Sequence, residues 1–147
     1  MKNFNPVEIL IVEDNPRDSE LITRVLKKQN ILNELYVAED GAEALDFIFC
    51  RGIFSTRNSS NMLKVIFLDL KLPKINGLEV LKEIKTNPLT KKLPVVIITS
   101  SMEDPDIKQA YELGANSYVV KPVNFADFVS AMATIGLFWL LVNVAPK

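Results

Sequence analysis

Three carboxylates, a hydroxyl and an ammonium follow short apolar runs of this sequence, and their types suit phosphoryl chemistry. Glu13 and Asp14 follow the first run, Asp69 follows the third, Thr99 the fourth and Lys121 the fifth. Carboxylates within a few ångström raise each other's pKa, so three of them in one place need a counter-charge. An all-oxygen set with few protein ligands suits Mg²⁺. A carboxylate beside Mg²⁺ and a lysine can attack phosphorus as a nucleophile, because the cations neutralise the phosphoryl oxygens.

The apolar runs that precede these residues are expected to be β-strands. They are short and rich in β-branched residues, and three are nearly continuous in apolar character, which is typical of strands buried on both faces. Helix-start signals separate them, each with a capping side chain, a proline at the first turn or both. The strands are expected at 7–12, 34–38, 65–68, 94–98 and 117–120, and the helix starts at Asn15-Pro16, Asp40, Asn76, Asp104-Pro105 and Asn124.

Five strands alternating with five helices predict an α/β fold, a (βα)₅ doubly wound parallel sheet with helices on both faces. Right-handed crossovers favour the flavodoxin-like strand order 2-1-3-4-5 at this size. In that order the first, third, fourth and fifth strands are neighbours, so the five reactive side chains should meet at one edge of the sheet. We expect a single domain over residues 6–147, with a core that ends between 120 and 130 and an extended C-terminal helix and tail over 131–147.

Composition narrows the function further. The chain has 147 residues, a length typical of one domain, and a net charge of −1, which argues against a nucleic-acid partner. It contains no histidine, which excludes Ser-His-Asp and Cys-His catalysis, histidine-ligated metals and an internal histidine phosphodonor. No secretory signal is visible, and the apolar stretch 135–142 is shorter than the roughly 20 residues of a membrane span. A cytoplasmic protein without a membrane partner is therefore expected.

The reactive set resembles the receiver domain of two-component response regulators, over about residues 6–130. One departure is Asn76, which stands where the family often has Asp and which caps a helix equally well. A narrower resemblance, to the stand-alone regulators that are paired with bacterial phytochromes, rests on the insertion over 50–61 and on two apolar motifs. The residues that carry the two resemblances are Glu13-Asp14, Asp69 in Phe-Leu-Asp-Leu-Lys-Leu-Pro-Lys, Gly77, Thr99, Lys121-Pro122 and the late Leu-Phe-Trp-Leu at 137–140.

The resemblance implies a role for each of these residues. Asp69 is expected to accept a phosphoryl group from a separate sensor histidine kinase, with a phytochrome as the narrower expectation. Mg²⁺ is expected on Glu13, Asp14, Asp69 and the backbone carbonyl of Lys71. Thr99 and Lys121 are expected to meet the phosphoryl group, and Tyr118 to pack inward behind Thr99 as part of a switch. The resemblance also implies a cis Lys121–Pro122 bond, and it describes a phosphoacceptor rather than an enzyme.

The C-terminal helix predicts a second kind of contact. Phe125, Phe128, Val129, Met132, Ile135 and Trp139 form one apolar stripe that should face the sheet. The opposite face becomes apolar in the second half of the helix, at Leu137, Phe138 and Leu141. A helix that is apolar all round is covered on both sides. A homodimer is the expected cover, and the alternative is that the helix end folds back onto its own domain.

Two other functions stay open at this point. A phosphatase could use Asp69 as a covalent nucleophile, but it needs a second acid two residues on, where this chain has Lys71. A phosphorylation-independent scaffold would need only the dimer. For a stand-alone receiver, we expect the output to be a protein–protein contact.

Overall fold

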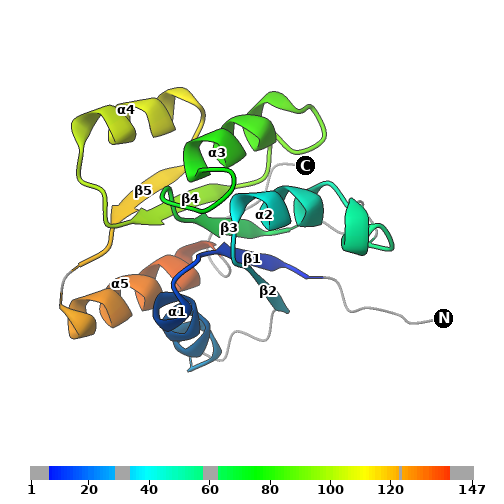
Figure 1. Cartoon of the computed structure of the whole chain (residues 1–147). Coiled ribbons are helices and arrows are strands. Elements are labelled where there is room, and N and C mark those ends of the chain that lie inside the picture. Colours follow the sequence, from blue (N-terminus) through cyan, green and yellow to red (C-terminus); the bar gives the residue numbers. More distant parts are fainter. Residues whose placement is uncertain (1–6, 29–33, 58–62, 123, 140–147) are drawn as a thin grey trace.

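The computed structural model describes residues 7–28, 34–57, 63–122 and 124–139, in which five parallel strands alternate with five helices (Figure 1). This alternation confirms the predicted fold. The strands are β1 (Ile9–Val12), β2 (Leu35–Ala38), β3 (Val65–Leu68), β4 (Val95–Thr99) and β5 (Ser117–Val120). The helices are α1 (Pro16–Lys28), α2 (Gly41–Ile48), α3 (Gly77–Thr86), α4 (Asp104–Glu112) and α5 (Phe125–Leu137), with a short 3-10 turn, η1 (Gly52–Phe54).

The strand order is β2-β1-β3-β4-β5, as the sequence predicted. Helices α1 and α5 cover one face of the sheet, and α2, α3 and α4 cover the other (Figure 1). Successive side chains of a strand point to opposite faces of the sheet, so each central strand contributes to the hydrophobic cores on both faces. Ile9 and Ile11 of β1 pack toward α1 and α5, whereas Leu10 and Val12 pack toward the three-helix side. This two-sided burial explains why the strands read as nearly unbroken apolar runs.

Short polar side chains begin four of the five described helices at the positions that the sequence indicated, whereas α4 begins at Asp104 without a side-chain cap. The Asn15 side chain accepts the backbone N–H groups of Arg17 and Asp18, which opens α1 directly after the end of β1. Asp40 and Asn76 accept an N–H in the same way at the starts of α2 and α3. Because each cap fixes where its helix starts, it also fixes the loop that leads out of the preceding strand.

The insertion between α2 and β3 packs as an aromatic cluster. Tyr36 stacks on Phe47 with ring centroids 4.6 Å apart, and Phe54 of η1 meets both rings edge-on. The guanidinium of Arg57 lies over the Phe47 ring at 3.8 Å and donates to the Phe47 carbonyl. Residues 58–62 of the insertion lie outside the described residues.

Helix α5 packs on the sheet through the stripe that its sequence predicted. Phe128 and Met132 are buried against the β-sheet core, and Val129, Ile135 and Trp139 are half-buried there. The Phe125 side chain and residues 140–147 lie outside the described residues. No helix in the described part of the chain combines the length and apolarity that crossing a membrane requires.

Candidate functional site

Three carboxylates meet where β1 and β3 end. Val12 pairs with Leu68 across the two strands, so Glu13 and Asp69 leave the sheet at the same level. One carboxylate oxygen from each of Glu13, Asp14 and Asp69 lies within 4.8 Å of the others. Glu13 is 3% exposed and Asp69 is 8% exposed, whereas Asp14 faces solvent. The group thus has two buried members and one exposed member.

Lys121 brings the positive charge to this group. It follows β5, and its Nζ donates to Glu13 Oε1 at 2.5 Å, to Asp69 Oδ2 at 2.9 Å and to Asp18 Oδ2 at 2.9 Å. An ammonium has three N–H donors, so each of the three finds a carboxylate. The backbone N–H of Lys121 donates to the Thr99 carbonyl at 2.7 Å, which ties the ends of β4 and β5 together.

Asp18 is a member of the site that sequence reasoning missed. In the sequence it stands out only as an acid in the first turn of α1, a position that suits the helix dipole. The usable signal was its place in the chain: Pro16 starts α1 two residues after Asp14, so the first turn must lie near the ends of the strands. That signal needs the path of the helix as well as its sequence.

The environment of the site raises the pKa of two of its groups, Glu13 and Lys121, for different reasons. Burial raises the pKa of the Glu13 carboxyl to about 7, against the hydrogen bond from Lys121, and the charge of Asp69 adds to the rise. Burial alone would lower the pKa of Lys121, but its hydrogen bonds to Glu13, Asp18 and Asp69 outweigh it and raise the pKa above its usual value. Lys121 therefore stays charged, and the cluster still carries more negative than positive charge.

The donor set fits a divalent cation. All the candidate ligand atoms are carboxylate oxygens, which hard cations such as Mg²⁺ prefer, and the exposed Asp14 gives solvent access to the group. The backbone N–H of Lys71 donates to Asp69 Oδ1 at 3.2 Å, which orients that carboxylate. The Lys71 side chain itself is exposed.

Thr99 and Tyr118 meet at the loop that follows β4. Thr99 is fully buried, and its Oγ1 accepts the backbone N–H of Ser101 at 3.4 Å. The Tyr118 hydroxyl donates to the Ser101 carbonyl at 2.9 Å, and its half-buried ring packs against the core on the side of α2, α3 and α4. The Ser101 hydroxyl in turn donates to Asp106 of α4 at 2.5 Å. Both predicted switch residues thus contact the same short segment.

The expectation of a cis Lys121–Pro122 bond was wrong. The described residues contain no cis peptide bond, so this bond is trans. The trans isomer is the one that X–Pro bonds favour, by about 0.5–1 kcal/mol.

The three residues expected at a dimer contact are only partly visible. Phe138 is 46% exposed at the end of α5, and its ring meets Trp139 edge-on with centroids 5.3 Å apart. The Leu137 side chain and the whole of Leu141 lie outside the described residues.

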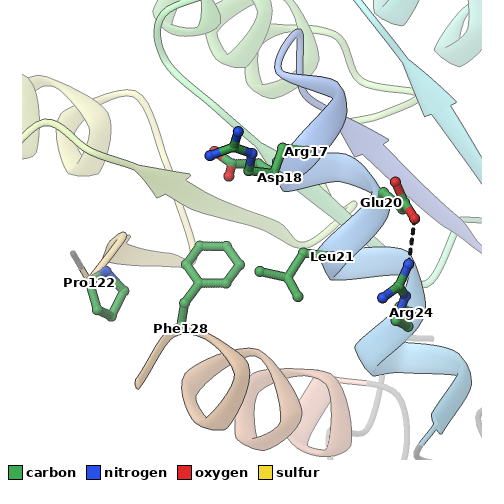
Figure 2. Close-up of a pocket in the computed structure, with 7 residues that line it drawn as sticks. All are labelled: Arg17, Asp18, Glu20, Leu21, Arg24, Pro122 and Phe128. Carbon is green, nitrogen blue, oxygen red and sulfur yellow. Dashed lines mark hydrogen bonds and ion pairs between the residues drawn. The ribbon is translucent and has the colours of Figure 1, made fainter. Parts of the chain in front are cut away.

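A pocket of about 370 Å³ lies beside the site, between α1 and the start of α5 (Figure 2). Its apolar lining comes from Leu21, Pro122 and Phe128, and the remaining lining residues, Arg17, Asp18, Glu20 and Arg24, are charged. Sequence reasoning did not predict it. Asp18 belongs both to this pocket and to the hydrogen bonds around Lys121.

Comparisons with known proteins agree with this geometry. The model of the response regulator receiver domain family matches residues 9–133. The response regulator Rcp1 of Synechocystis sp. is 42% identical over 141 residues, which are 96% of this chain and 94% of Rcp1. The crystal structure of the Mn²⁺-bound form of Rcp1 superposes with a TM-score of 0.89 at 40% identity, and covers 95% of this chain and 98% of that one. That of the phosphorylated cyanobacterial phytochrome response regulator RcpA has a TM-score of 0.88 at 34% identity, and covers 95% of this chain and 97% of that one.

Proposed function

This chain belongs to the response regulator receiver family, and from that premise we propose that it is a phosphorylation switch whose phosphoacceptor is Asp69. The observation that supports this role best is the Lys121 ammonium, which lies 2.9 Å from Asp69 Oδ2 within the carboxylate group. It sets a fixed positive charge where the oxygens of an incoming phosphoryl group would need one. Among the described carboxylates, only Asp69 and Glu13 both contact Lys121 and belong to the group of candidate cation ligands.

The transfer is a displacement at phosphorus. A carboxylate oxygen of Asp69 forms a bond to phosphorus while the P–N bond of a phosphohistidine breaks, and the leaving imidazole keeps that electron pair. These 147 residues contain no histidine that could serve as the donor, and we take the donor to be a sensor histidine kinase. Lys71 orients Asp69 through its N–H, and Lys121 neutralises charge on the transferred group.

A divalent cation, which we take to be Mg²⁺, completes the site. Glu13, Asp14 and Asp69, with the backbone carbonyl of Lys71, would hold it, and it would supply further positive charge to the phosphoryl oxygens. The support on this chain is the excess negative charge of the cluster and its all-oxygen donors. The relative Rcp1 takes Mn²⁺, a cation with similar ligand preferences.

The signal leaves the site through Thr99 and Tyr118. A new phosphoryl group on Asp69 would attract the Thr99 hydroxyl, which now accepts from Ser101. Tyr118 holds the other side of Ser101, so a shift of this segment changes its contacts as well. Such a switch responds only as far as the phosphoryl group interacts differently with its two states. We propose that the output is a protein–protein contact.

Two partners complete the proposal. The kinase is a phytochrome, because the similar protein RcpA is a phytochrome response regulator and the overlap with it covers nearly the whole of both chains. The second partner is another copy of this chain, bound through the end of α5, where the exposed Phe138 continues an apolar sequence. The domain that carries both contacts spans residues 6–147.

Incubation with acetyl phosphate and Mg²⁺ tests the acceptor. We expect the protein to gain one phosphate that is labile to acid and base, and Asp69→Asn to gain none, as measured by intact-protein mass spectrometry. Asp127→Asn, which changes an exposed acid in the first turn of α5, is the matched control and should take up phosphate normally. No uptake by the unmodified protein would favour a scaffold, and continued turnover beyond one equivalent would indicate a phosphatase.

A further inference from the structure

Asp18 is the acid on Lys121 that lies outside the group of candidate cation ligands. We propose that Asp18 is a positioning residue: it holds the Lys121 ammonium beside Asp69 while Glu13 and Asp69 are engaged with the cation and the phosphoryl group. This role rests on the proposed function, since it concerns the same transfer to Asp69.

The contact between Asp18 and Lys121 is supported by hydrogen bonds at the start of α1. Asp18 Oδ2 lies 2.9 Å from Lys121 Nζ, the same distance as Asp69 Oδ2. Asn15 Oδ1 accepts the Asp18 N–H at 3.3 Å, and Glu13 Oε2 accepts the Asn15 N–H at 3.2 Å. The first turn of α1 is therefore anchored to the end of β1. Because these bonds hold the backbone of Asp18, its carboxylate stays within reach of the ammonium.

The two other acceptors of Lys121, Glu13 and Asp69, change their bonding during the proposed transfer. Glu13 and Asp69 are both candidate ligands of a cation, and a phosphoryl group on Asp69 changes the very carboxylate that Lys121 contacts. Lys121 carries its charge on a flexible four-carbon stem, which gains rotamer freedom when its acceptors leave. With Asp18 in place, one N–H remains directed at a fixed carboxylate, and the others are free to turn to phosphoryl oxygens without the side chain moving away.

The opposite role is the competing hypothesis. A carboxylate so close to the site could hold Lys121 back from the phosphoryl group and add an unfavourable negative charge. In that case removal of Asp18 would accelerate phosphorylation. The two roles therefore predict changes of opposite sign in the same measurement.

The first experiment compares Asp18→Ala, Asp18→Asn and Glu20→Ala in phosphorylation by acetyl phosphate with saturating Mg²⁺. We expect the maximal rate of Asp18→Ala to fall about tenfold or more, the size expected for one lost hydrogen bond to a charged group. The acetyl phosphate concentration at half-maximal rate should stay unchanged. Asp18→Asn, which keeps an acceptor oxygen, should recover part of the rate. Glu20→Ala is the matched control, since it removes an exposed acid of α1 that pairs with Arg24.

The second experiment observes Lys121 directly in the metal-free protein by ¹⁵N NMR of its ammonium group, assigned with Lys121→Arg. An ammonium with three carboxylate partners should exchange slowly with water, and this exchange should accelerate in Asp18→Ala but not in Glu20→Ala. Phosphorylation of Asp18→Ala at the wild-type rate or faster, or unchanged exchange at Lys121, would overturn the role of Asp18. If Asp18→Ala does not fold, Asp18→Asn decides through the same two measurements. Failure of the unmodified protein to take up phosphate would instead overturn the proposed function.

Discussion

The Glu13 carboxyl has a raised pKa, and the reason is physical. It is almost completely buried at the end of β1, and it lies close to the charge of Asp69. Its one strong compensation is the hydrogen bond from Lys121. Without a cation, burial therefore favours the protonated form of Glu13 over the ionised form.

A pH dependence of stability follows for the metal-free protein. Burial first, and the charge of Asp69 in addition, raise the pKa of Glu13 in the folded state from 4.5 to about 7 despite the bond to Lys121. Between these values the folded state keeps a proton that the unfolded chain has lost. The contribution of Glu13 is thus fully present below pH 4.5 and is lost as the pH rises through 7, with a slope of at most about 1.4 kcal/mol per pH unit.

Urea unfolding in EDTA across that pH range measures this contribution. Glu13→Gln cannot titrate, so its free energy of unfolding should fall less steeply with rising pH than that of the wild type. Glu20→Gln, at an exposed position on α1, should keep the wild-type slope. Equal slopes for the wild type and Glu13→Gln would contradict the prediction.

Sequence alone could predict which strand ends carry acids and bases, but not every contact between them. Glu13, Asp69 and Lys121 follow apolar runs, so the order of a parallel sheet was enough to place them together. Asp18 could not be found in this way, because its contact with Lys121 depends on the direction in which α1 leaves β1. The isomer of the Lys121–Pro122 bond was predicted wrongly, since it depends on local packing rather than on the two residue types.

At the scale of elements, the start of α3 fixes the backbone of Asp69. Gly77 opens this helix, and its N–H donates to the Leu70 carbonyl at 2.7 Å. A Cβ atom at Gly77 would lie 2.2 Å from the Asp69 carbonyl oxygen and 2.5 Å from the Leu70 Cα. Only a residue without a side chain allows this approach, which makes Gly77 a support for the candidate phosphoacceptor.

Gly77→Ala should therefore push the Asp69 segment out of place. In an ordinary helix the substitution would be favourable, by up to about 1 kcal/mol. Here the clash is with backbone, so we expect a net loss of about 1–3 kcal/mol in the free energy of unfolding, and slower phosphorylation by acetyl phosphate. Both are measurable, by urea titration and by mass spectrometry.

Gly52→Ala is the control for this prediction. Gly52 has φ +58° in the insertion, and a Cβ atom there meets only an Asp46 side-chain oxygen at 3.8 Å. The substitution should cost about 1–2 kcal/mol through backbone strain and leave the phosphorylation rate unchanged. A Gly77→Ala protein that is phosphorylated as fast as Gly52→Ala would contradict the role of Gly77.

The elements themselves were largely predictable, because strand runs and helix caps are local signals. The apolar runs gave the strands to within two residues at each end, and Asn15, Asp40, Asn76 and Asn124 marked helix starts correctly. The packing of the insertion was not predictable. Phe54 of the insertion meets the rings of Tyr36 and Phe47 edge-on, and these residues belong to separate elements. Arg57 adds a contact with Phe47 that hydrophobic periodicity does not indicate.

At the scale of the whole molecule, the proposed dimer is the property most open to test. Leu137→Glu combined with Phe138→Glu should convert a dimer to a monomer in light scattering, because charges at an apolar contact lose hydration without a partner. Phosphorylation by acetyl phosphate should survive, since both positions lie at the far end of α5 from Lys121. Leu89→Glu is the matched control, because Leu89 is 83% exposed and lies outside α5. A double variant with the mass of the wild type would contradict the dimer.

The position of the single tryptophan of the sequence has a practical consequence. Trp139 follows the last turn of α5, and that helix of 13 residues is about 20 Å long. Its indole packs on the core beneath α1 and α5, remote from the acidic end of the sheet. The tryptophan fluorescence of this protein therefore reports on the surroundings of the end of α5. A change in tryptophan emission on formation of the aspartyl phosphate would show that the far end of α5 responds to a reaction at the other end of the helix.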